Sequence, residues 1–278
     1  MNAEELLKCE QLAVRLAIDA GRMMTTASDK QRRGHGKESP IDLVTETDGQ
    51  VERYLFGELG KSYPDHRFVG EEQTNGFGDG QGLTSAPTWI IDPIDGTTNF
   101  VHNNPFTCIA IALAIQREPV LGIVYNPFLD KLYTARKGSG AYCNGRPIRV
   151  REPCESLAKA LVVGGIGADS DPEKRRQMAA NFGRMAFATH GVRCLGSCAL
   201  EMCYVAEGYA DANWAIGVHV WDLAAASLII TEAGGVVVDT EGGAVDIMNR
   251  RAIGASHSRL AQEFSRALPY QLQYERDN

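Results

Sequence analysis

The sequence predicts a layered α/β protein with mixed sheets. Three observations support this prediction: a helical apolar pattern near the start of the chain, a series of short apolar runs rich in β-branched residues, and a second half in which strand and helix patterns alternate. The length of 278 residues allows roughly two domains. No linker-like segment divides the chain, however, so we expect one domain over residues 1–278.

The first part of the chain predicts two helices. Residues 4–27 carry apolar side chains at near-helical spacing among charged ones, which indicates one long amphipathic helix. Residues 28–40 are polar, basic and glycine-rich, and they predict a loop or the tip of a hairpin. Residues 48–60 repeat the helical pattern and predict a second helix.

Apolar runs after the second helix predict strands. Each run is short, rich in β-branched residues and bounded by glycine, proline or asparagine. Their nearly continuous hydrophobicity indicates strands that are covered on both faces. The runs are RFVGEE (67–72), TWIIDP (88–93), TCIAIALAI (107–115) and VLGIVYN (120–126).

The remainder of the chain predicts strands in alternation with helices. Strands are expected at 160–163, 192–195, 209–214, 235–239 and 251–255, and helices at 172–187, 197–207, 221–233 and 257–267. Gly234 and Gly235 indicate where the helix at 221–233 ends.

The composition argues against several classes of protein. The difference between 28 basic and 35 acidic residues is a net charge of −7, so we expect no nucleic-acid or membrane partner. No apolar run reaches the roughly 20 residues that a membrane-spanning helix needs. Seven cysteines without a CxxC pair, and an acidic amino-terminal segment, favour a cytoplasmic location over secretion. A negatively charged protein can still bind an anionic substrate through metal ions.

The segment WIIDPIDGTTNF (89–100) places two carboxylates at the end of an apolar strand. Pro93 is expected to end the strand pairing and Gly96 permits a tight turn, so Asp92 and Asp95 can converge beyond the strand. Converging carboxylates repel each other unless a proton or a cation separates them, and their oxygens suit a hard divalent metal. Asp-Pro and Asp-Gly pairs are also common in ordinary turns, which leaves a purely structural role open.

The residues that follow the second aspartate suit a phosphate group. Gly96 lets the backbone approach a ligand closely. Thr97, Thr98 and Asn99 are residue types that begin helices, where backbone N–H groups point outward toward an anion. The segment therefore predicts a phosphate beside the metal.

Further acidic residues lie at the ends of predicted elements. Asp48 precedes the second helix, Glu71 follows the apolar run RFV, and Asp222 opens a later helix. Separately, Asp48 and Asp222 could be helix N-caps and Glu71 a solvated loop residue. Together with Asp92 they repeat one arrangement, a carboxylate at the mouth of an apolar element, which favours a shared metal site.

Three motifs occur together in this chain: GEE (70–72), WIIDPIDGTTNFVH (89–102) and GVHVWDLAAASLIITEAGG (217–235). The combination resembles the inositol monophosphatase family of magnesium-dependent, lithium-sensitive phosphatases, and the similarity extends from Lys37 to Arg251. The resemblance implies a five-layer αβαβα sandwich, a homodimer, and two to three Mg²⁺ ions in each active site.

The resemblance also implies a set of metal ligands. Glu71, Asp92 and the backbone carbonyl of Ile94 would hold one Mg²⁺ ion. Asp92, Asp95 and Asp222 would hold a second, and a third, weaker ion would lie near Glu71.

Other roles follow from the same resemblance. Gly96 and Thr97 would contact the phosphate through their backbone N–H groups. Thr97, hydrogen-bonded to Asp48, would orient or deprotonate the attacking water. Lys37 lies in a segment that matches a loop near the metals.

Substrate contacts are implied for two of the metal ligands, Asp95 and Asp222, and for the turn formed by Gly196, Ser197 and Cys198. The sequence also departs from the family pattern: Ala215 stands where inositol-selective members carry a glutamate, and Ala168 aligns with a serine of the polyol pocket. A site that loses groups for binding hydroxyls discriminates less among substrates, so we expect relaxed selectivity.

We therefore expect Mg²⁺-dependent hydrolysis of an inositol monophosphate by metal-activated water. Two alternatives stay open: a related phosphatase of histidinol phosphate, glycerol phosphate or a sugar phosphate, and a catalytically silent binding protein on the same fold. The haloacid-dehalogenase class is disfavoured, because its Asp-x-Asp signature differs from the spacing of Asp92 and Asp95.

Overall fold

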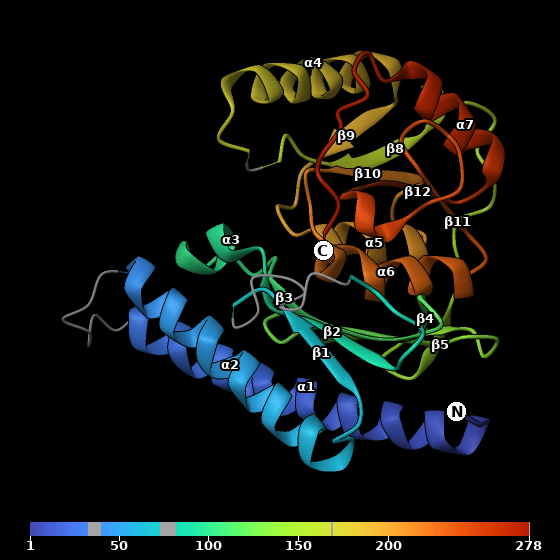
Figure 1. Cartoon of the computed structure of the whole chain (residues 1–278). Coiled ribbons are helices and arrows are strands. Elements are labelled where there is room, and N and C mark those ends of the chain that lie inside the picture. Colours follow the sequence, from blue (N-terminus) through green and yellow to red (C-terminus); the bar gives the residue numbers. More distant parts are fainter. Residues whose placement is uncertain (33–39, 73–81, 168, 278) are drawn as a thin grey trace.

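The computed structural model describes residues 1–32, 40–72, 82–167 and 169–277. The helices in these ranges are α1 (Ala3–Arg32), α2 (Pro40–Ser62), α3 (Thr97–Val101), α4 (Pro172–Ala188), α5 (Cys198–Ala206), α6 (Val220–Glu232) and α7 (Ser258–Ala267). Helices α1 and α2 cover one face of a first sheet, α5 and α6 lie between this sheet and a second one, and α4 and α7 cover the far side (Figure 1). Within the described residues this is the predicted αβαβα sandwich.

The first sheet follows the order of the chain. Its strands are β1 (Arg67–Gly70), β2 (Thr88–Asp95), β3 (Cys108–Ile115), β4 (Glu118–Asn126), β5 (Lys131–Arg136), β6 (Ala141–Cys143) and β7 (Arg146–Ile148). β1 pairs with β2 in parallel, and each later strand pairs with its predecessor in antiparallel fashion. β2 is therefore an inner strand, and all of its residues are buried.

The second sheet is mixed. Its strands are β8 (Leu161–Gly164), β9 (Gly191–Arg193), β10 (Ala212–Ile216), β11 (Val236–Val238) and β12 (Arg251–Ala255), in the spatial order β11-β12-β10-β8-β9. β8 runs parallel to both β9 and β10, whereas β12 runs antiparallel to β10 and β11.

Separate buried clusters fill the spaces between the layers. Trp89 and Ile91 of β2 face the cluster beneath α1 and α2, while Ile90 between them faces the cluster around α5 and α6. A third cluster, which includes Trp214 and Phe264, lies between the second sheet and the helices α4 and α7. The burial of both faces of β2 confirms the prediction from its continuous hydrophobicity.

Several predicted boundaries are wrong. The second helix begins at Pro40 rather than near residue 48, because proline is well tolerated in the first helical turn. Asp48 is therefore inside α2, and it is not an N-cap. The first helix continues to Arg32, and residues 33–39 of the expected loop lie outside the described residues. Strand β10 begins at Ala212, three residues later than expected.

Three strands of the first sheet, β5 to β7, were absent from the predicted elements. β6 and β7 have three residues each and β5 is half-buried, so none of them presents a long apolar run. They extend the sheet away from β2 and do not change the position of the strand that carries the two aspartates.

Candidate active site

An irregularity in β2 brings its two aspartates toward one place. Asp92 pairs with Ala110 of β3 and Asp95 pairs with Cys108, so three steps along β2 oppose two along β3. Such a bulge changes the side to which the following side chain points. The expectation that Pro93 ends the strand is wrong, because pairing resumes at Asp95; the expected convergence of the two carboxylates nevertheless occurs.

Asp92, Asp95 and Asp222 form a carboxylate cluster. Each offers an oxygen atom, and these atoms lie within 4.8 Å of one another. Burial and the neighbouring carboxylates raise the pKa of Asp222 to about 8 and hold the pKa of Asp92 well above its usual range. Ionisation of all three groups is unfavourable unless a cation is shared among them, and the all-oxygen donor set suits a hard divalent metal.

Asp222 reaches the cluster from the first turn of α6. The backbone N–H of His219, the N-cap residue, donates to the Asp222 carboxylate (2.6 Å), and the Asp222 N–H donates to the His219 carbonyl oxygen (3.1 Å). Asp222 is thus the third helical residue of a capping box rather than the N-cap itself. This reciprocal pair fixes the carboxylate relative to the helix end.

Asp95 is held by the amino-terminal end of α5. Its carboxylate accepts hydrogen bonds from the Ser197 hydroxyl (2.6 Å) and from the backbone N–H groups of Cys198 (3.1 Å) and Ala199 (2.7 Å). Burial raises the pKa of Asp95, and these donors oppose the increase. The turn at Ser197 and Cys198, for which the family resemblance implies substrate contacts, therefore positions a carboxylate of the cluster.

Glu71 and Asp48 add negative charge beside the cluster. Burial, followed by repulsion from Glu72, raises the pKa of Glu71 to about 7 and that of Asp48 to about 9. Glu71 and Asp48 in turn raise the pKa of Asp92, so they lie close enough to interact with it electrostatically.

Glu52 was missed in the sequence analysis. It is fully buried on α2, accepts a hydrogen bond from the backbone N–H of Glu72 (2.9 Å), and raises the pKa of Asp48 and Glu71. The available signal was its position one helical turn after Asp48, on the same side of α2.

The turn after β2 has the features of an anion site. Gly96 precedes α3 with a φ of 89°, and a Cβ atom there would lie 3.0 Å from the carbonyl oxygen of Phe106. Glycine is therefore required on both conformational and steric grounds. Thr97 is exposed at the start of α3, and its hydroxyl donates to the carbonyl oxygen of Ile94 (3.1 Å) rather than to Asp48 as expected.

Asn99 joins this turn to the turn that precedes α5 in the second half. Its amide group donates to the carbonyl oxygens of Phe106 (2.6 Å) and Leu195 (2.7 Å). Gly196 and Gly96 approach each other closely: a Cβ atom on Gly96 would lie only 3.1 Å from the Gly196 carbonyl oxygen.

Three further positions were singled out from the sequence: Ala215, Lys37 and Ala168. Ala215 is a buried residue of β10, paired with Ala252 of β12. Lys37 and Ala168 lie outside the described residues.

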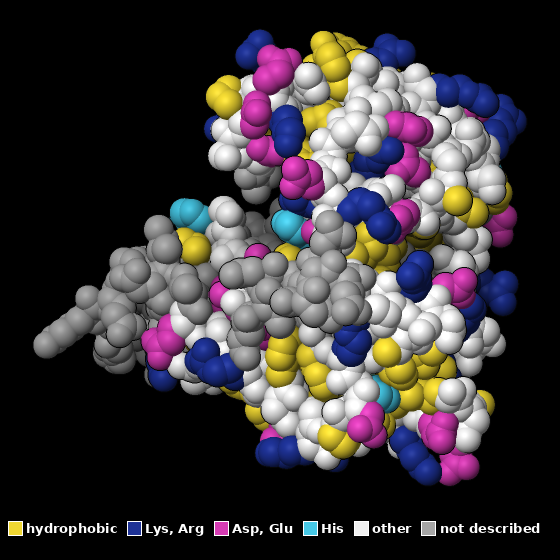
Figure 2. All heavy atoms as spheres, in the orientation of Figure 1, with side chains coloured by type: hydrophobic (Ala, Val, Ile, Leu, Met, Phe, Trp, Pro, Cys, Tyr) yellow, Lys and Arg dark blue, Asp and Glu magenta, His cyan; other side chains and the backbone are white. Residues whose placement is uncertain are grey.

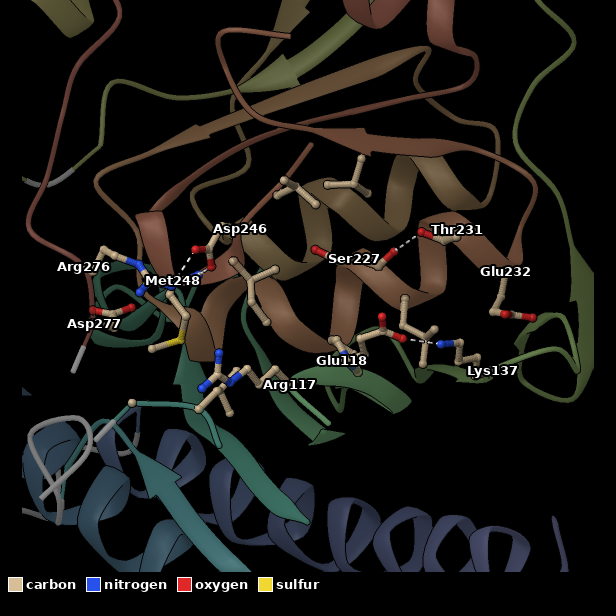
Figure 3. A pocket seen from close by; sticks show the side chains of 17 residues that line it. Arg117, Glu118, Lys137, Ser227, Thr231, Glu232, Asp246, Met248, Arg276 and Asp277 are labelled. Carbon is tan, nitrogen blue, oxygen red and sulfur yellow. Dashed lines mark hydrogen bonds and ion pairs between the residues drawn. The ribbon is translucent and has the colours of Figure 1, made fainter. Parts of the chain in front are cut away.

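A large cavity elsewhere in the molecule is not the candidate site. It has a volume of about 580 Å³ and lies along the later turns of α6, where Ser227, Leu228 and Thr231 line it (Figure 3). None of the three cluster carboxylates is among its described lining residues. Charged side chains line this cavity too, but acidic and basic groups there form ion pairs, Glu118 with Lys137 and Asp246 with Arg276. We place the chemistry at the carboxylate cluster, because its acids converge without a basic partner among the described residues and can share a metal ion.

Acidic and basic side chains of the described residues intermingle on the face drawn in Figure 2. Among the described residues, no helix combines the length and apolarity that crossing a bilayer requires.

Comparison with known proteins agrees with the geometry. A model of the inositol monophosphatase family matches residues 5–271. The chain belongs to this family. Human inositol monophosphatase 1 is 42% identical over 267 residues, which cover 96% of each chain. Mouse inositol monophosphatase 2 is 44% identical over 272 residues, which cover 98% of this chain and 93% of the relative.

Solved structures of inositol monophosphatases share the fold. The enzyme from Anabaena (Nostoc) sp. PCC 7120 has a TM-score of 0.80 at 30% identity, with 95% of this chain and 96% of that chain covered. SaIMPase-II with bound inositol monophosphate has a TM-score of 0.75 at 26% identity, with 93% of each chain covered. As a member of the inositol monophosphatase family, the chain is a phosphoric monoester hydrolase.

Proposed function

We propose that this chain hydrolyses inositol monophosphate to inositol and inorganic phosphate, with Mg²⁺ as its cofactor. The observation that carries the proposal is the cluster of Asp92, Asp95 and Asp222, whose carboxylate oxygens lie within 4.8 Å of one another. Relatives named as inositol monophosphatases, with 42–44% identity over nearly the whole chain, support the choice of substrate.

The residues present fit divalent ions. Glu71, Asp92 and the carbonyl oxygen of Ile94 would hold one ion, and Asp92, Asp95 and Asp222 a second. A third ion would lie near Glu71. All of these ligands are oxygen atoms, as Mg²⁺ prefers, and the raised pKa values of Glu71 and Asp222 indicate a site that lacks compensating positive charge. Bound ions would neutralise the ester, lower the pKa of a nearby water and stabilise the leaving alkoxide.

The protein groups around the ions would bind the phosphate and orient the water. The backbone N–H groups of Gly96 and Thr97 would hold the phosphate oxygens at the start of α3. The Thr97 hydroxyl would turn from the Ile94 carbonyl oxygen, donate a hydrogen bond to Asp48, and use its own oxygen to orient or deprotonate the attacking water.

The substrate's hydroxyl groups would meet the second half of the molecule. Asp95, Asp222 and the turn at Gly196, Ser197 and Cys198 would contact them. Ala215, and Ala168 with it, would leave fewer polar partners for an inositol ring, and we propose that selectivity among small phosphate esters is relaxed for this reason.

Further properties of the enzyme belong to the same proposal. We propose that lithium inhibits the reaction, that the enzyme acts in the cytoplasm as a homodimer, and that residues 1–278 form one domain. Lithium inhibition and the homodimer rest on the family resemblance, and the cytoplasmic location rests on the cysteine pattern and the acidic amino-terminal segment. The single domain rests on the lack of a linker-like segment and on the shared cluster, which draws on both halves of the chain.

A substrate panel tests the proposal. Phosphate release from inositol 1-phosphate, glycerol 2-phosphate and histidinol phosphate should be measured at fixed Mg²⁺, with and without lithium. We expect Mg²⁺-dependent release from inositol 1-phosphate, with the other esters within about a hundredfold, and inhibition by lithium. If none of the three esters releases phosphate, the proposed function is wrong. If inositol 1-phosphate is preferred by more than about a hundredfold, only the relaxed selectivity is wrong.

A further inference from the structure

The segment that follows α7 ends beside the first turn of α6. Asp277 in this segment has a side chain that is only 7% exposed. One of its carboxylate oxygens contacts Nδ1 of His219 (2.8 Å), and the other accepts a hydrogen bond from the backbone N–H of Val220 (2.7 Å). The two contacts join residues that are 57 and 58 positions apart in the sequence.

Several contacts fasten this segment to the second half of the molecule. Asn181 of α4 exchanges two hydrogen bonds with the backbone of Tyr270, both of 3.0 Å. The Arg251 guanidinium donates to the carbonyl oxygen of Leu272 (3.1 Å), and the backbone N–H of Asp277 donates to the Met248 carbonyl oxygen (3.0 Å). The position of Asp277 is therefore set by the packed layers around it.

The partners of His219 determine which of its ring nitrogens carries the proton. The Arg250 guanidinium, which can only donate, lies 3.0 Å from Nε2. Nε2 must then accept, and Nδ1 carries the hydrogen that it donates to Asp277. Asp277 thus receives two hydrogen bonds from the end of α6, one from the ring of the N-cap residue and one from the first helical N–H.

His219 connects the contacts of Asp277 to the carboxylate cluster. The first N–H groups of a helix have no partner within the helix, and Asp277 supplies one for Val220. The neighbouring His219 N–H donates to Asp222, whose carboxylate belongs to the cluster. Asp277 therefore fixes the backbone on which the Asp222 carboxylate rests.

We infer that Asp277 is a positioning residue for Asp222, and that it sets the affinity of the cluster for the second divalent ion. The inference rests on the proposed function, because it concerns the ion that Asp92, Asp95 and Asp222 would share. The first ion, which would be held by Glu71, Asp92 and Ile94, depends on elements of the first sheet and should be little affected. Outer-shell partners of metal ligands commonly change metal affinity by about 10–100-fold.

Direct metal binding tests the inference without measuring activity. Mn²⁺, which accepts the same oxygen ligands as Mg²⁺, is titrated into the metal-free full chain, and free Mn²⁺ is followed by electron paramagnetic resonance. The variants are Asp277→Ala, which removes both contacts, and Asp277→Asn, whose single acceptor oxygen can serve only one of the two donors. The control is Arg276→Ala, which removes an exposed ion pair with Asp246 (2.5 Å; Figure 3) but no contact of α6.

For Asp277→Ala we expect one Mn²⁺-binding step to lose about tenfold or more in affinity, while another step stays as in the wild type and shows that the site is folded. Asp277→Asn should lie between wild type and Asp277→Ala, and Arg276→Ala should match the wild type. Unchanged Mn²⁺ binding by Asp277→Ala, or equal losses of affinity in both steps, would overturn the role of Asp277 but leave the proposed metal site in place. A wild-type chain that binds no Mn²⁺ would instead overturn the proposed metal site and this role with it.

Discussion

The carboxylate cluster is built differently on its two sides. On the side of the first sheet, Asp92 accepts one hydrogen bond, from the backbone N–H of Ile94 in its own turn (3.0 Å), and is surrounded by other acids. On the side of the middle helices, Asp95 and Asp222 accept hydrogen bonds from the ends of α5 and α6. The first sheet thus contributes negative charge, and the helix ends contribute the donors that orient it.

This difference separates two requirements of a metal site. Acids that repel one another create the affinity for a cation, while hydrogen-bond donors keep the acids in a geometry that a cation can use. The Asp95 carboxylate meets both requirements, because it lies on β2 and accepts from α5. Neither half of the molecule completes the cluster by itself.

The largest expected effect compares Asp92→Asn with Asp95→Asn. Both variants should lose activity by about 10³-fold, because each removes a charge that would bind metal. Their effects on the metal-free protein should have opposite signs at pH 8. Asp92→Asn replaces a buried carboxyl group whose ionised form is repelled by its neighbours and should raise Tm, whereas Asp95→Asn leaves donors of α5 without an acceptor and should cost about 1–3 kcal/mol of stability.

Thermal denaturation and phosphate release measure these two effects. Glu118→Gln, which alters only an exposed ion pair with Lys137, serves as the control and should change neither quantity. If Asp92→Asn and Asp95→Asn shift Tm in the same direction, the claim that the two sides of the cluster are built differently is wrong.

The pH dependence of stability tests the charged side of the comparison. Burial, and repulsion from neighbouring carboxylates, raise the pKa values of Glu71, Asp222 and Asp48 to about 7, 8 and 9 respectively. The folded metal-free protein therefore binds more protons than the unfolded chain between about pH 4 and pH 9, and its stability should fall as pH rises through this window. The expected loss is about 1.4 kcal/mol for each unit by which these pKa values exceed those of the unfolded chain, and saturating Mg²⁺ should remove it. A loss of the same size with Mg²⁺ present would contradict the shared cause.

Thr97 tests the phosphate side of the first sheet. Thr97→Val removes the hydroxyl that would orient the attacking water, and kcat should fall by about 10²-fold, while Thr97→Ser should retain most of the activity. The Mg²⁺ dependence of both variants should match the wild type, since the backbone carbonyl of Ile94 remains in place. If Thr97→Val keeps the wild-type kcat, the Thr97 hydroxyl takes no part in the reaction.

The smallest expected effect concerns selectivity in the second half. Ala215→Glu restores the residue type that the family resemblance predicts for hydroxyl binding. The ratio of kcat/KM for inositol 1-phosphate to that for glycerol 2-phosphate should rise by about tenfold. Ala215→Gln, which offers a neutral group of similar size, is the matched control and should raise the ratio less. An unchanged ratio for Ala215→Glu would remove this position from substrate recognition.

The sequence predicted the parts of the fold that depend on local pattern. The buried strand β2 and the long helix α1 follow from apolar spacing, and the αβαβα layers were implied by the family resemblance. The start of α2 was placed eight residues too late because the acids around Asp48 resembled a helix entrance. The short strands β6 and β7 carry too few apolar residues to be recognised.

Long-range contacts account for what the sequence could not predict. Asp277 contacts His219 and Val220 only because the second half folds around α6, and no local pattern marks an aspartate in an irregular segment as a partner of a distant helix. The buried position of Glu52 likewise depends on how α2 packs against the turn that contains Glu72. Patterns along the chain identify candidate acids, but packing decides which of them meet.

The central claim is that the clustered acids hold protons until divalent ions replace them. Isothermal titration calorimetry of Mg²⁺ into the metal-free chain at pH 7, in buffers of different ionisation enthalpy, tests it most directly. We expect a binding heat that changes with the buffer, because protons leave Asp222 and its neighbours as the ions bind. Absence of binding, or binding that releases no proton, would contradict the account.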